Sequence, residues 1–267
     1  MSIVKELEGK EFCLSLSGGG ALGFAHLGVL SNLEKYNLAP SEILGTSMGG
    51  IIGALYSIGL KESEITNIVS EFASITRWVK FSFNGNAIID TKKIEKIFNS
   101  IFGNKKLSDT KIPLKIVATE FATSKKRVFQ AGDNIKITDA LLATMAIPGI
   151  FKEHIIEDKV YVDGFLCENL PILEATKENI LAIDVLGKNS FDTTLPNNFF
   201  KTQNVIEMFE KSMRTLIYNQ TQTNLKLVNS KVFLLEPITK EYKTFSFHKL
   251  TELRELGLNL LGGCKVK

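Results

Sequence analysis

The stretch SLSGGGALGFAHLGVL occupies residues 15–30 and decides how the rest of the chain is interpreted. It continues an apolar run, FCLSLS (12–17), that is typical of a buried strand, and its later apolar residues recur at helical spacing. The sequence therefore predicts a strand, a tight glycine turn and a helix. The glycines at 18, 20 and 23 match the G-x-G-x-x-G of a dinucleotide-binding turn. The same loop could instead present backbone N–H groups to the oxyanion of an acyl-transfer reaction.

Composition indicates a globular protein with a sizeable core. The chain has 267 residues, of which 44% are hydrophobic and 23% charged, close to the average for soluble domains. This length suits one large α/β domain, so we expect residues 1–267 to form a single domain. The N-terminus lacks the apolar run of a signal peptide, and no stretch of about 20 apolar residues occurs. We therefore expect a cytoplasmic protein.

Charge and cysteine content give no support to several other classes of function. The net charge is +3, and the lysines are scattered in short pairs such as Lys125-Lys126, which are expected on solvated faces. Nucleic-acid binding is therefore not indicated. The three cysteines have no C-x-x-C spacing, which argues against a disulfide framework and a structural zinc site.

The strand–turn–helix pattern occurs a second time near the start of the chain. SEILG (41–45) is a predicted strand, TSMGG (46–50) a turn, and GIIGALYSIG (50–59) a helix rich in small residues. Two such units in succession predict an α/β sheet. Further strands are expected at 112–119, 159–164, 179–187 and 231–237, and further helices at 91–102, 138–147, 205–228 and 250–260.

The second turn carries a candidate nucleophile. Gly45, Ser47 and Gly49 match G-x-S-x-G and lie between a predicted strand and a predicted helix, as a nucleophile elbow requires. Glycines flank the serine because the strained turn leaves no room for side chains. The helix N-terminus favours negative charge beside the serine Oγ.

An activated serine also needs an oxyanion hole, and the first glycine loop offers one. Gly18, Gly19 and Gly20 follow the neighbouring predicted strand and have unhindered N–H groups. The dinucleotide interpretation needs an acid at the end of the second strand, but Glu34 and Glu42 precede or begin that strand. A P-loop is excluded because no Lys-Ser/Thr follows the glycines.

Two arrangements could provide the base. In the first, Asp163 in YVDGFLCENLP (161–171) accepts the serine proton from a strand end, directly before Gly164. In the second, His248 forms a Ser-His-Asp triad with Asp184 or Asp163. His154 and His248 lie in segments without a turn that would fix an imidazole, and His26 is predicted to be a packed helix residue.

Four segments resemble, in order, the signature blocks of the patatin-like phospholipases: SLSGGGALGFAHLGVL (15–30), GTSMGG (45–50), ATMAIPGIF (143–151) and YVDGFLCENLPI (161–172). The resemblance implies a three-layer α/β/α sandwich with a central, mostly parallel sheet. It also implies hydrolysis of lipid acyl esters by a dyad of Ser47 and Asp163, without a metal or other cofactor. The amides of residues 18–20 would form the oxyanion hole. The helix with Pro148 and the segment 169–171 would support the site.

Two residues depart from the family pattern. Leu22 stands where members often carry Arg or Lys, and Phe165 stands where a second small residue usually follows Asp-Gly. These departures leave open a rival function, a lipid- or nucleotide-binding module that kept the loop but lost catalysis.

A cluster of aromatic residues, Trp78, Phe81 and Phe83, precedes a turn. These side chains could cap an acyl-binding cleft or belong to the core, where large aromatics are usually found. If they are exposed, they would give weak interfacial contact with membrane lipid.

Overall fold

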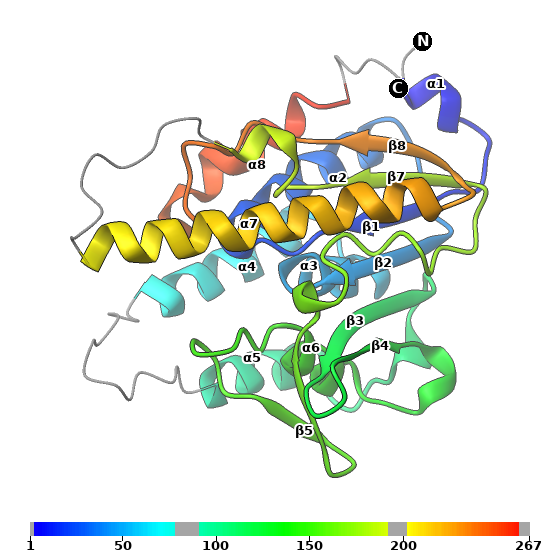
Figure 1. The fold of residues 1–267 in the computed structure, drawn as a ribbon. Coiled ribbons are helices and arrows are strands. Elements are labelled where there is room, and N and C mark those ends of the chain that lie inside the picture. Colours follow the sequence, from blue (N-terminus) through cyan, green and yellow to red (C-terminus); the bar gives the residue numbers. More distant parts are fainter. Residues whose placement is uncertain (1–2, 78–90, 192–201, 262–267) are drawn as a thin grey trace.

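The structure, a computed structural model, describes residues 3–77, 91–191 and 202–261 (Figure 1). The helices are α1 Ile3–Leu7, α2 Ala25–Lys35, α3 Met48–Ser57, α4 Glu62–Arg77, α5 Lys92–Phe102, α6 Ile137–Thr144, α7 Thr202–Leu227 and α8 Leu250–Leu258. The strands are β1 Cys13–Leu16, β2 Glu42–Thr46, β3 Leu114–Glu120, β4 Lys125–Phe129, β5 His154–Ile156, β6 Lys159–Asp163, β7 Asn179–Ile183 and β8 Lys231–Leu235. All eight strands belong to one sheet.

The centre of the sheet is parallel, in the order β3-β2-β1-β7-β8. Leu16 at the end of β1 pairs with Gly45 near the end of β2. The glycine loop and the GTSMG turn therefore emerge side by side, at the edge where parallel α/β sheets bind their ligands. The predicted α/β fold with a mostly parallel sheet is confirmed, and the antiparallel strands β4, β5 and β6 extend it beyond β3.

Strand β3 extends past the end of β2 and receives β6 on the same edge. Val117 pairs with Thr46 of β2 and also with Val128 of β4, so β2 and β4 occupy opposite edges of β3. The next residue, Ala118, pairs with β4 and with Asp163 of β6. Strand β6 therefore continues the edge on which β2 has ended.

Each face of the sheet is covered by a separate core, because successive side chains of a strand point to opposite faces. On one face, Cys13, Leu44 and Ile180 pack against residues that include Leu170 and, on α7, Leu225. On the other face, the alternate residues of the same strands join the larger core with α2, α3, α6 and α8. Figure 1 shows α7 in front of the sheet and α2 and α3 behind it, in three layers.

Several boundaries differ from the sequence-based expectation. The segment 125–129 is strand β4, which its charged sequence KKRVF did not reveal, and the short elements α1 and β5 were not predicted. Helix α6 ends at Thr144, so it stops well before Pro148. The aromatic cluster at 78–83 lies outside the described residues. None of the described helices has the length and apolar composition of a membrane span.

Candidate active site

Ser47 occupies the sharp turn between β2 and α3. Its backbone has φ +53° and ψ −123°, a conformation that residues other than glycine rarely adopt and that is found mostly at functional sites. The Ser47 N–H donates a hydrogen bond to Oγ1 of Thr144 at 2.8 Å, and the Thr144 hydroxyl donates in turn to the carbonyl of Val117. Helix α6 thus holds the turn from behind, through a threonine that sequence reasoning did not single out.

Three glycines permit the close approach of chain segments around Ser47. A side chain at Gly49 would collide with the carbonyls of Leu16 and Ser17, and one at Gly45 would collide with the start of α3. A side chain at Gly164 would collide with the Val117 carbonyl and lie 2.9 Å from Thr46 Cγ2. Glycine at these three positions leaves room for the neighbouring backbone, and at Gly45 and Gly49 this is the packing expected of a tight elbow.

Asp163 is fully buried at the end of β6. Its backbone N–H donates to the Ala146 carbonyl at 3.0 Å, and its Oδ1 accepts the Phe165 N–H at 3.0 Å. Burial raises the pKa of the carboxyl to about 7, although hydrogen bonding from the Ser47 hydroxyl and the Phe165 amide lowers it in part. Oδ2 has no hydrogen-bond partner of standard geometry among the described residues. The Ser47 hydroxyl is therefore close enough to lower the pKa of this carboxyl, but it makes no hydrogen bond of standard geometry to Oδ2.

The glycine loop lies against Ser47, but only part of it is free to bind a ligand. A Cβ at Gly18 would lie 3.2 Å from the Ser47 Cβ. The Gly18 N–H is not available, because it donates to the Asn169 carbonyl at 3.1 Å. Within the described part of the chain, the N–H groups of Gly19 and Gly20 form no hydrogen bond. The three amides expected for the oxyanion hole are thus reduced to two.

An apolar pocket opens beside Ser47. Its lining also includes Gly20, Met48, Ile51, Met145, Ile147, Phe151, Phe245 and Phe247. Among these lining residues, Ser47 supplies the polar side chain. The pocket can therefore hold a hydrocarbon group next to the serine hydroxyl.

The segment that contributes Phe245 and Phe247 to the pocket lining is hydrogen-bonded to the glycine loop. The Ala21 N–H donates to the Thr244 carbonyl at 2.8 Å. The Thr244 hydroxyl donates to Glu210 of α7 at 2.8 Å, and Glu210 forms an ion pair with Arg214 at 2.9 Å. Sequence reasoning missed this connection because its members lie far apart along the chain.

His26 is a buried helix residue, as predicted. Its Nε2 lies 2.9 Å from the Ser17 carbonyl, to which it donates a hydrogen bond. Burial lowers the pKa of the imidazole to about 4, so the ring is neutral at neutral pH. His26 therefore supports the start of the glycine loop from within α2.

The other two histidines form no hydrogen bond or ion pair with Ser47 or Asp163 among the described residues. His154 is on β5 and contacts Asp139 at 3.2 Å. His248 is exposed and lies near Glu252. Asp184 is buried at the end of β7, where its Oδ1 accepts the Leu186 N–H at 3.0 Å. No contact among the described residues joins His248 to either aspartate of the alternative triad.

The remaining predicted residues are placed as follows. Pro148 is exposed, so the support from this segment comes from Thr144 and Ala146 instead. Leu22 is fully buried in the larger core, and Phe165 is a partly buried residue that packs against that core. No group of three or more His, Cys, Asp or Glu side chains that could bind a metal ion occurs in the described ranges.

A serine in a strained strand-to-helix turn, with a buried carboxyl and free loop amides beside it, defines an α/β protein with a nucleophile-elbow site. The family profile described as "Patatin-like phospholipase" matches residues 14–176, and the chain belongs to this family. The family resemblance seen in the sequence is thereby confirmed.

Similarity to individual proteins extends over most of the chain. The chain is 25% identical to "Lysophospholipase NTE1" of Debaryomyces hansenii over 285 aligned positions, which cover 97% of this chain but 18% of that protein. It is 29% identical over 161 residues to an uncharacterized NTE family protein of Mycobacterium bovis, which covers 60% of this chain and 44% of the relative. The chain thus spans less than half the length of either relative.

A solved structure supports the fold assignment. The crystal structure of VipD from Legionella pneumophila matches with a TM-score of 0.54 and 14% identity, covering 95% of this chain and 66% of that one. At this level of identity the likeness concerns the fold.

Proposed function

We propose that the protein is a serine acylhydrolase of the phospholipase, lysophospholipase or esterase type, acting on lipid acyl esters through a dyad of Ser47 and Asp163. The observation that carries the proposal is the Asp163 carboxyl, buried beside the Ser47 turn with a pKa of about 7. A carboxyl with that pKa is ionised in about half of the molecules at neutral pH, which suits a general base. Membership of the patatin-like phospholipase family supports the same reaction.

The reaction follows from the groups present. Asp163 accepts the Ser47 proton while the serine Oγ attacks the ester carbonyl, and the amides of Gly19 and Gly20 stabilise the oxyanion. Asp163 then protonates the leaving alcohol, which leaves an acyl-serine. Water attacks this ester, giving its proton to Asp163, and the fatty acid is released as the Ser47 hydroxyl is restored. Each oxyanion donor contributes about 2.7–4 kcal/mol in comparable sites.

The apolar pocket beside Ser47 is the proposed site of the acyl chain. Ile51, Met145 and Phe151 give it a hydrocarbon lining, and none of the described residues that line it is charged. The headgroup would then lie outside the pocket, where polar groups remain hydrated. Contact with a lipid surface is proposed to be interfacial and weak. Tight, salt-insensitive binding to neutral vesicles in a co-sedimentation assay would contradict this.

A fluorophosphonate probe tests the proposal most directly. We expect it to label the wild-type protein and Ser100→Ala, a control at an exposed serine of α5, but not Ser47→Ala. Hydrolysis of p-nitrophenyl esters, lysophospholipids, phospholipids and monoacylglycerols would then define the substrate. Absence of labelling in the folded wild-type protein would favour the rival function, a binding module without catalysis.

A further inference from the structure

The segment that follows Asp163 contacts both loops of the candidate site. The Glu168 carbonyl accepts a hydrogen bond from Oγ1 of Thr46 at 2.9 Å, directly before Ser47. Asn169 accepts the Gly18 N–H at 3.1 Å, and its Nδ2 donates to the Gly18 carbonyl at 3.3 Å. Residues 168 and 169 therefore join the ends of β1 and β2 to the end of β6.

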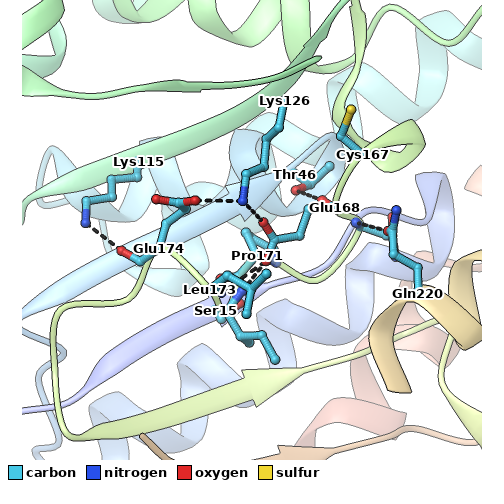
Figure 2. Close-up of polar contacts among 12 residues, drawn as sticks. Ser15, Thr46, Lys115, Lys126, Cys167, Glu168, Pro171, Leu173, Glu174 and Gln220 are labelled. Carbon is cyan, nitrogen blue, oxygen red and sulfur yellow. Dashed lines mark hydrogen bonds and ion pairs between the residues drawn. The ribbon is translucent and has the colours of Figure 1, made fainter. Parts of the chain in front are cut away.

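The Glu168 side chain holds this segment in place through hydrogen bonds and an ion pair. The residue is 1% exposed, and its Oε1 accepts the N–H groups of Ile172 at 3.0 Å and Leu173 at 3.1 Å. Its Oε2 forms an ion pair with Lys126 at 2.7 Å. Figure 2 shows the Lys126 side chain extending from β4 to both Glu168 and Glu174. The ion pair between Lys126 and Glu174 measures 2.6 Å.

Lys126 corrects an expectation from the sequence. The pair Lys125-Lys126 was expected on a solvated face, but β4 pairs with β3 and turns the second lysine inward. The Lys126 side chain is 26% exposed, whereas Lys125 is exposed. A buried carboxylate is costly unless it is paired, so loss of Lys126 would leave the Glu168 carboxylate buried without this charged partner.

We propose that the Lys126–Glu168 ion pair is a positioning element of the site. It fixes the position of the segment 164–171. Through the hydrogen bonds of this segment with Thr46 and Gly18, it maintains the positions of the serine turn and the glycine loop relative to Asp163. The inference rests on the proposed function. Neither side chain contacts Ser47 or the Asp163 carboxyl in the described contacts, so the effect is indirect. It acts through geometry, and a displacement of about 1 Å can cost about 10²-fold in rate.

The adjacent lysines offer a matched test. Lys126→Met and Glu168→Gln are compared with Lys125→Met, a control on the same strand, and with Lys126→Arg, which retains the charge. For each folded variant we measure Tm, kcat and KM with a p-nitrophenyl ester, and the rate of fluorophosphonate labelling. We expect kcat and the labelling rate to fall about 10- to 100-fold in the first two variants, with KM changing much less.

The remaining variants separate positioning from stability. Lys125→Met should match the wild type, and Lys126→Arg should recover most of kcat. The double variant Lys126→Met/Glu168→Gln should be little worse than either single one, because the two residues act as a unit.

Wild-type kcat in folded Lys126→Met would overturn the inference even if Tm falls. If that variant does not fold, Glu168→Gln decides in the same way, since it keeps an oxygen for the two amides. Absence of Ser47-dependent hydrolysis in the wild type would instead refute the proposed function itself.

Discussion

Ser47 and Asp163 meet because the strands that carry them follow one another along a single edge of β3. Thr46, directly before Ser47, pairs with Val117, and Asp163 pairs with Ala118. Strand β6 runs antiparallel to β3 and therefore arrives at the point where β2 has just turned away. The carboxyl is buried against the serine turn and has no charged partner among the described residues, and this burial raises its pKa.

Replacing Asp163 with Asn should abolish most of the turnover. The amide cannot accept the Ser47 proton, and loss of a general base costs about 10²- to 10⁴-fold. The fold should persist, because the Asn oxygen can still accept the Phe165 N–H. Steady-state hydrolysis and circular dichroism check both points. Asp158→Asn, at an exposed residue before β6, is the control and should match the wild type. The dyad would be wrong if Asp163→Asn kept a tenth or more of the activity.

Histidine variants distinguish the dyad from a triad. His248→Ala and His154→Ala should retain acylation within about tenfold, equivalent to about 1.4 kcal/mol of indirect effects. His248 is exposed and His154 contacts Asp139, and neither ring hydrogen-bonds to Ser47 among the described contacts. A triad predicts a loss of several orders of magnitude on removal of its histidine. Burst-phase acylation of a p-nitrophenyl ester by each folded variant decides between them.

Activity should depend on the ionisation of Asp163. The base works only when deprotonated, and burial raises its pKa to about 7 in the free protein. We therefore expect kcat/KM to fall about tenfold per pH unit below pH 7 and to reach a plateau above it. The rate of fluorophosphonate labelling should follow the same curve, because it also requires an activated serine. A flat profile between about pH 5 and 8 would show that another group, or none, serves as the base.

Filling the apolar pocket should exclude long acyl chains selectively. Ile147 lines the pocket beside Ser47, so Ile147→Trp should lower kcat/KM for long-chain esters at least about tenfold, while acetyl esters are affected less. Ile155→Trp, on β5 at a residue that is 58% exposed, is the matched control and should show no such discrimination. Equal losses for acetyl and long-chain esters in Ile147→Trp would place the acyl site elsewhere.

The sequence by itself determined the local parts of the site. Strand, turn and helix periodicity defined the α/β class, and G-x-S-x-G between a strand and a helix identified the Ser47 turn. These features depend on residues within a few positions of one another, so short segments encode them. The resemblance in four ordered blocks gave the family, which the profile match over residues 14–176 confirms.

Only the tertiary structure decided which distant groups meet. It brings Asp163 to the Ser47 turn, because β3 aligns β2 and β6 on one edge. It also leaves His248 exposed. It removes the Gly18 amide from the expected oxyanion hole through Asn169, and it pairs the half-buried Lys126 with the buried Glu168. These contacts join residues far apart along the chain. They follow from strand pairing and register, which periodicity and composition do not specify.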